Sequence, residues 1–334
     1  MDWNLKIGLA LLAFLTALAF TPPPFDPTAQ VDPVSSRNLP PATRLLEVEL
    51  NNGDLLLAAA LDHDSQDLVL TGQGPQRTVP LKNIANLTAH GIEDSRLFLM
   101  GTDKFGRDIW SRVIAGARIS LSIGLLSVML AMTLGVLIGT LAAVGPSWLD
   151  SVLMRLVDGL LAFPAFFLVL ALSALLEPTL GQVILILGST SWMTITRLCR
   201  AEILSIKHRD FIIASRSLGI PTWRIALRHM LPNALTPLVV QATLLVGDLI
   251  LAEAALSYFG LGVQPPTPSW GNMISDSQEA LGTTWWIALF PGIAVAITVI
   301  AFNLLGDGLR TALDPKRRTA DPKTILPSST ASPL

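Results

Sequence analysis

The segment 210–237 combines positive charge, small residues and helix signals between two strongly apolar runs. Within it Phe211, Ala214, Ser215 and Leu218 follow the i, i+3, i+4, i+7 spacing, which places them on one face of a short helix. A face of small and apolar side chains permits another protein to approach closely. The chemistry predicted for this segment is therefore recognition of a partner and not the making or breaking of bonds.

The same segment contains signals for a turn and a second helix. Gly219 suits a left-handed helix C-cap, Pro221 suits the first turn of the next helix, and Pro232 marks the return toward an apolar run. One face of the second helix carries Trp223, Ala226, Leu227 and Met230, and another face carries Arg224 and Arg228. The alternative is an amphipathic loop that rests on lipid headgroups, a surface that basic residues also favour.

The composition is that of a membrane protein. Of 334 residues, 51% are hydrophobic and 14% are charged, and the mean hydropathy is +0.55. A net charge of -2 gives no support for nucleic-acid binding. The single cysteine, Cys199, excludes an internal disulfide, and the four histidines do not cluster along the chain. We expect this chain to bind no metal and no cofactor.

Six apolar segments are long enough to span a bilayer, which takes roughly 20 residues for a hydrocarbon core of about 30 Å. They are residues 5–20, 117–144, 153–176, 180–198, 236–257 and 286–306. The predicted fold class is an all-α membrane protein with six transmembrane helices. We predict that the first helix is retained as an anchor; a signal peptide with an Ala17-Leu18-Ala19 cleavage site is the alternative.

The predicted organisation has four parts, with the basic loop 199–235 inside the third. These are the first transmembrane helix (1–20), an extracytoplasmic insertion (21–112), a core of five transmembrane helices (113–306) and a tail (307–334). The loop and the tail are rich in lysine and arginine, whereas the short segment before the last span has neither. Because positive loops stay in the cytoplasm, both termini are predicted to be cytoplasmic.

The insertion 21–112 differs in character from the rest. It opens with a proline-rich stretch and continues with short alternating runs, and Asn51-Asn52-Gly53-Asp54 is a good hairpin turn. We predict a small β-rich subdomain after the first helix, with a loosely ordered spacer as the alternative. Nothing in it has the spacing of a catalytic or metal site.

Ionisable and polar residues inside apolar runs are costly and are therefore functional candidates. Asp248 lies midway through the fifth span, where it could line a pathway and favour a cationic solute such as a peptide amino terminus, or could contact Gln241. Glu253 and Asn303 are further pathway candidates, and packing is an equal alternative for Glu253. For Asp158 and Asp307 we expect local ion pairs with Arg155 and Arg310.

The run 214–232 resembles the signature loop of binding-protein-dependent ABC importer permeases. Ala214 and Ser215 occupy the alanine positions, Gly219 the glycine, and Leu231-Pro232 the closing pair. Two positions depart from that pattern, since Ile213 replaces a glutamate and His229 replaces an isoleucine. Loss of the glutamate removes a carboxylate that could bond to an ATPase.

Four further stretches are similar to the dipeptide, oligopeptide and nickel subfamily of these permeases, and specifically to its C-type subunit. They are MGTDKFGRDIWSRVIAGARISLSIG at 100–124, MRLVDGLLAFP at 154–164, LAEAALSYFGLGVQPPTPSWGNM at 251–273 and FNLLGDGLRTALDP at 302–315. They occur in the order of that subfamily, and they cover nearly all of the chain beyond residue 98.

The resemblance implies half of an importer in a bacterial cytoplasmic (inner) membrane. A second permease would complete the pathway, two ABC ATPases would bind the coupling loop, and an extracytoplasmic binding protein would deliver di- or oligopeptides or related solutes. The residues implied for coupling are Ala214, Ser215, Gly219, Leu231 and Pro232, with Trp223 and Arg224 beside them.

The chain contains no G-x-x-x-x-G-K-[ST] phosphate loop, so ATP and Mg are expected to be used by the partner ATPases and the chain itself is not predicted to be an enzyme. Two readings from other classes remain. One is a secondary transporter or channel without an ATPase. The other is a membrane-anchored adaptor that uses 21–112.

Overall fold

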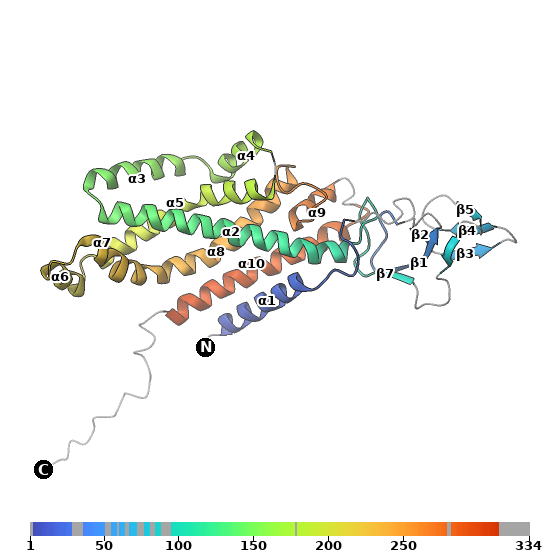
Figure 1. Ribbon diagram of the computed structural model, residues 1–334, viewed down its shortest axis with the longest axis horizontal. Helices are drawn as coiled ribbons and strands as arrows, with labels where there is room; N and C mark the ends of the chain where they lie inside the picture. The colour runs from blue at the N-terminus through green and yellow to red at the C-terminus, as the bar shows by residue number, and fades with distance from the viewer. Residues whose placement is uncertain are drawn as a thin grey trace, which may run out of the picture.

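The computed structural model is an elongated bundle of helices with β-strands beyond one end (Figure 1). It describes residues 3–28, 36–50, 55–58, 60–63, 67–71, 77–80, 84–87, 95–177, 179–278 and 282–313. The helices are α1 (Trp3–Phe20), α2 (Ile109–Val144), α3 (Ser147–Leu161), α4 (Ala165–Leu175), α5 (Leu180–Ile206), α6 (Asp210–Ser217), α7 (Thr222–Ile225), the π-helix η3 (Ala226–Met230), α8 (Leu231–Tyr258), α9 (Trp270–Asp276) and α10 (Trp286–Leu313).

Within the described residues, four helical stretches are long and apolar enough to cross a membrane: α1, α2, Thr222–Tyr258 and α10. The pair α3 and α4 adds a fifth if it is counted as one span. Helix α5, which occupies the predicted span 180–198, is rich in serine and threonine and does not meet the same criterion. The coarse expectation of a multi-pass helical protein is therefore confirmed, and the sixth span stays a prediction.

The predicted third span, 153–176, is wrong as a single helix. Helix α3 ends at Leu161, α4 begins at Ala165, and the two are bent by 85°. Pro164 explains the break, because it lacks the N–H that would continue the ladder and it disfavours helical backbone at Phe163.

Two predicted boundaries also move. Helix α2 begins at Ile109, so the last residues of the segment 21–112 belong to a core helix. Helix α10 continues to Leu313, into the predicted tail, and 314–334 lie outside the described residues. Both changes lengthen helices beyond their apolar stretches.

Local sequence signals fix the beginnings of three helices. Asp108 caps α2, since its carboxylate accepts a hydrogen bond from the backbone N–H of Ser111. Thr179 with Gln182 forms a capping box at α5, and Ser269 with Asn272 forms another at α9. These side chains satisfy backbone donors that have no partner in the first turn of a helix.

Helices α1 and α10 approach each other through two glycines. A Cβ added to Gly8 would lie 2.7 Å from the backbone nitrogen of Leu305, and one added to Gly308 would lie 2.7 Å from Cα of Leu5. Only glycine permits this separation, and small residues serve the same purpose in membrane helix pairs generally. The two contacts show that α1 packs antiparallel to α10 as part of the bundle.

The β-strands form two sheets. In the first, β1 (Thr43–Leu50) pairs antiparallel with β2 (Leu55–Ala58), β6 (Ile84–Leu87) and β7 (Ser95–Phe98); in the second, β4 (Asp67–Thr71) lies between β3 (Ala60–His63) and β5 (Arg77–Pro80). The predicted turn 51–54 lies outside the described residues. Figure 1 shows the strands at the end of the bundle opposite α6 and α7. We call these two ends the β end and the α6 end.

Candidate functional site

The turn between α6 and α7 is a left-handed helix cap. Gly219 has φ +77°, its N–H donates to the carbonyl of Arg216 at 2.9 Å, and the N–H of Ile220 donates to the carbonyl of Ser215 at 3.3 Å. This pair of bonds is the Schellman motif, and the positive φ is the reason that glycine is favoured here. A Cβ at Gly219 would meet nothing within 4 Å, so the turn is open to a partner.

Most apolar side chains of α6 and its C-cap are exposed, and one is buried. Phe211 and Leu218 are exposed, Leu218 to 80%, and Ile213 is exposed at the position where the family pattern has a glutamate. The residue that anchors α6 is Ile212, which is fully buried in a cluster with Ile203 and Ile225. The predicted stripe is therefore the free face of the helix, and its buried contact was not predicted.

The second predicted stripe is divided, which corrects the expectation of one regular helix. Ala226 and Met230 are buried, whereas Trp223 and Leu227 are exposed. The cause is the π-helix η3, in which the N–H of Leu231 donates to the carbonyl of Ala226 five residues earlier. Pro232 follows directly and cannot donate to the preceding turn, which weakens the regular ladder at this point.

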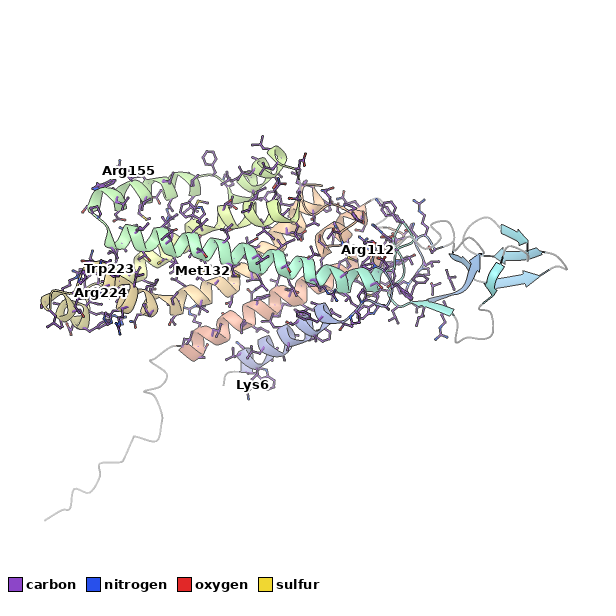
Figure 2. The ribbon with its side chains drawn as sticks, in the orientation of Figure 1. Lys6, Arg112, Met132, Arg155, Trp223 and Arg224 are labelled. Carbon is purple, nitrogen blue, oxygen red and sulfur yellow. The ribbon has the colours of Figure 1, made fainter. Side chains whose placement is uncertain are left out.

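The free face is basic as well as apolar. The guanidinium of Arg224 lies 5.3 Å from the ring centroid of Trp223, and Arg216 and Arg228 are exposed nearby in the sequence. Figure 2 shows Trp223 and Arg224 together at the α6 end, with Arg112 toward the β end and Met132 between them along α2. Of the predicted coupling residues, Ala214 and Pro232 are exposed and Ser215 and Leu231 are half-buried.

The pathway candidates occupy different environments. Asp248 on α8 and Asn303 on α10 are exposed in the isolated chain. Glu253 is only 1% exposed, and its Oε1 accepts hydrogen bonds from Ser257 at 2.7 Å and Ser269 at 3.0 Å. These contacts join α8 to the start of α9, and the choice between packing and a pathway role for Glu253 stays a prediction.

Gln241, the predicted contact of Asp248, lines a cavity of about 490 Å³ between α5, α8 and α10. Thr236 and Arg310 contribute the other polar side chains of its wall. The expected local pair of Arg310 with Asp307 is not among the ion pairs of the described residues.

Asp158 forms an ion pair with a different arginine from the one predicted. Its carboxylate pairs with Arg197 of α5 and not with Arg155 one turn away. About two turns earlier on α3, Asp150 accepts two bonds from Arg200, at 2.6 and 2.7 Å. Since Val157 is the one buried residue of α3, these two ion pairs provide much of the contact between α3 and α5.

The β end contains a buried ionic cluster that we did not predict from the sequence. Arg107 donates to Asp103 at 2.6 Å and to Asp276 at 2.9 Å, and Arg112 lies 3.7 and 3.6 Å from the same two carboxylates. All four side chains are buried or nearly so. Asp103 and Arg107 are four residues apart, so their pairing could have been predicted from the sequence. Asp276 is distant in the sequence, and no local pattern indicates that it joins them.

Trp270 of α9 completes this end of the bundle. Its indole N–H donates to the carbonyl of Val113 at 3.0 Å, and its backbone N–H donates to Ser120 at 3.1 Å. Helix α9 is thereby held against α2 by buried polar contacts.

Comparison with known proteins agrees with this architecture. Residues 135–319 match the family described as binding-protein-dependent transport system inner membrane component. The di/tripeptide transport system permease protein DppC of Pseudomonas aeruginosa is 44% identical over 223 residues, which are 67% of this chain and 74% of that protein.

A second relative and a solved structure point the same way. The dipeptide transport system permease protein DppC of Alkalihalophilus pseudofirmus is 42% identical over 219 residues, 66% of this chain and 72% of its own length. The MetNI methionine ABC transporter in an inward-facing conformation shares the fold, with a TM-score of 0.52 at 19% identity over 60% of this chain and 96% of that one. The chain belongs to the family of binding-protein-dependent transport system inner membrane components, the permease subunits of ABC importers.

Proposed function

We propose that this permease forms half of a peptide importer and is coupled to ATPases through α6, Gly219 and α7. The observation that carries the proposal is the uncovered apolar and basic face at the α6 end, with Leu218 and Trp223 exposed to 80% and 60%. The two short helices α6 and α7, of eight and four residues, present exposed apolar side chains on either side of a left-handed cap, and a cytoplasmic subunit could bind this surface. The assignment to ATPases follows the family, since its members are components of ATP-driven transport systems.

The proposed topology has six spans, with α5 as the sixth and with both termini and the α6 end in the cytoplasm. The segment 199–235, which includes the end of α5 and the start of α8, holds six lysines and arginines, and this supports that orientation. The strands at the β end would then be extracytoplasmic, where a solute-binding protein could reach them.

A second permease subunit is proposed to cover the break between α3 and α4. Residues 162–167 are exposed in the isolated chain, Phe163 and Phe167 among them. Irregular backbone at membrane depth is tolerated only where protein or a water-filled pathway covers it, because lipid cannot satisfy its polar groups. The break therefore belongs to the subunit interface or the pathway. Asp248 and Asn303 are proposed to face the same pathway.

The proposed solutes are di- and oligopeptides. The support comes from relatives named as dipeptide and di/tripeptide permeases and from the exposed carboxylate of Asp248, which would favour a charged amino terminus. This chain is proposed to bind no cofactor itself, and ATP and Mg would be consumed by its partners.

The test uses two glycines that have the same left-handed backbone conformation. Gly219 and Gly260 have φ of +77° and +76°, and a Cβ at either would meet nothing within 4 Å, but Gly260 lies at the β end. Aspartate costs each site about 1–2 kcal/mol of backbone strain. We expect Gly219→Asp to insert normally and to lose ATPase association and peptide uptake, while Gly260→Asp retains association. Asparagine tolerates left-handed backbone, so Gly219→Asn should restore part of the ATPase association and uptake.

Two results would count against the proposal. If Gly219→Asp retained ATPase association and uptake, α6 and α7 would not be the coupling site. If Gly260→Asp lost ATPase association to the same extent, the loss would reflect general strain and not the docking surface.

A further inference from the structure

An apolar groove of about 510 Å³ lies where the α6 end of α2 meets the coupling segment. Val136, Leu137 and Leu141 of α2 form one wall, Leu149 of α3 closes one end, and Leu227 with Trp223 forms the opposite wall. The hydroxyl of Thr133, also in the wall, is already bonded to the carbonyl of Met129 at 2.7 Å. The second hydroxyl of the lining, that of Thr140, lies 3.7 Å from Sγ of Cys199, so the groove offers few hydrogen-bonding groups to a ligand.

The groove lies at one end of α2, a helix long and apolar enough to span a membrane, so in a bilayer that α2 crosses it faces one leaflet. It follows the last turns of α2, a spanning helix, as far as Gly145, where the chain turns into α3. Leu137, Leu141 and Leu227 on its walls are exposed in the isolated chain. Trp148 and Trp223 are exposed at the same end, and tryptophan favours the boundary between hydrocarbon and headgroups.

The closed end of the groove is flanked by positive charge. Arg224 lies against the ring of Trp223, which is part of the wall. The ammonium of Lys207 donates to the carbonyl of Ala143 at 3.3 Å, which places it beside Val144, another wall residue. The neighbouring carboxylate of Asp150 accepts two bonds from Arg200, so these two side chains together add no net charge beside Lys207.

We propose that this groove binds an anionic phospholipid, with one acyl chain along α2 and the phosphate toward Arg224 and Lys207. An acyl chain suits the shape and the apolar walls, and a net negative headgroup suits the two cations. The lipid bridges α2 and the segment that contains Trp223 and Leu227. It therefore makes the position of the coupling segment depend on the composition of that leaflet. The site shares Trp223 and Arg224 with the proposed coupling surface, whereas Leu137 and Lys207 are not among the coupling residues, so variants at those two positions test lipid binding separately from the ATPase.

The experiment is native mass spectrometry of the full-length chain, with any subunits that accompany it, during titration with phosphatidylglycerol or phosphatidylcholine of the same acyl chains. Leu137→Trp fills the groove, and Leu126→Trp is its control on the same helix, since the two leucines are 56% and 46% exposed and Leu126 is outside the groove. Lys207→Gln removes a proposed headgroup contact. Its control is Arg155→Gln, which removes a positive charge from α3 outside the groove.

We expect saturable binding of phosphatidylglycerol and weaker binding of phosphatidylcholine. Leu137→Trp should weaken phosphatidylglycerol binding about tenfold, the loss expected when about two acyl methylenes leave an apolar contact. Lys207→Gln should reduce the preference for the anionic lipid, and both controls should bind as the unaltered chain does.

Three results would overturn the proposal. Equal binding of the two lipids would show that the cations do not select a headgroup. Unchanged binding by Leu137→Trp would place the lipid elsewhere. Crosslinking of Leu137→Cys to a second permease subunit would show that protein covers the groove, and the assignment of that crosslink is direct because the one native cysteine, Cys199, is buried.

Discussion

Arg107 and Asp276 form a buried ion pair of 2.9 Å that joins the loop before α2 to the last residue of α9, 169 positions later. Asp103 and Arg112 lie against the same pair, so two positive and two negative charges share one buried site. Removal of one partner leaves the other charges uncompensated away from water. The cluster therefore joins the loop before α2 to α9 at the β end.

Loss of this pair should destabilise the protein far more than loss of an exposed pair. Arg107→Ala is expected to cost about 3–5 kcal/mol, because an unpaired carboxylate remains buried. Asp158→Ala, which breaks the exposed pair with Arg197, should cost at most about 1 kcal/mol. Thermal unfolding in detergent measures both. Similar melting temperatures for the two variants would show that the buried cluster does not stabilise the β end.

Gly8 should be essential for the contact between α1 and α10. A Cβ there would lie 2.7 Å from the backbone of Leu305, so Gly8→Val must separate the helices and should lower the melting temperature. Gly292→Ala in α10 is the control, since its Cβ would meet nothing within 4 Å. The intact mass of the purified chain is measured alongside. A chain that lacked residues 1–19 and was indifferent to Gly8→Val would establish the signal-peptide alternative.

Glu253 is predicted to act through hydrogen bonding and not through charge. Glutamine keeps an oxygen that can accept from Ser257 and Ser269, so Glu253→Gln should retain stability and transport. Glu253→Ala leaves both hydroxyls without that acceptor and opens a cavity, so it should lose several kcal/mol, on the order of 3. Peptide uptake and melting temperature distinguish the two. Loss of uptake in a stable Glu253→Gln variant would instead assign the carboxylate to solute binding or gating.

Gly271 tests the packing of α9 against α8. An added Cβ would lie 2.8 Å from Cα of Ala254 and 2.8 Å from Cβ of Ser257, so Gly271→Ala must displace one of the two helices. Overpacking of this kind costs typically about 1–3 kcal/mol. Gly282→Ala has open space around it and should be neutral. Equal melting temperatures of the two variants would show that α9 can shift against α8 without loss of folding free energy, which would contradict tight packing at Gly271.

Local features of the fold could be predicted from sequence because they depend on neighbouring residues. The left-handed cap at Gly219 and the helix start after Pro221 need only the properties of glycine and proline. The break at Pro164 carries the same kind of signal. It was not predicted because the apolar run continues through it and hydropathy alone favours one span.

Other features depend on contacts that a single sequence does not reveal. Asp158 pairs with Arg197 and not with Arg155 because α3 lies along α5. That arrangement is a property of the assembled bundle. The buried face of α6 at Ile212 is hidden for the same reason, since apolar residues occupy both of its faces. The division of the second stripe depends on a π-helix that changes the spacing of side chains.

The central claim is that this chain works as half of an ATP-driven importer. Its most direct test is purification of the tagged chain from native membranes in mild detergent, followed by mass spectrometry of the proteins that accompany it. We expect to recover a second permease together with ABC ATPases, and to lose the ATPases alone from the Gly219→Asp variant. Recovery of the chain alone or as a homo-oligomer, while a control complex survives the same detergent, would contradict the account and favour a channel or a secondary transporter.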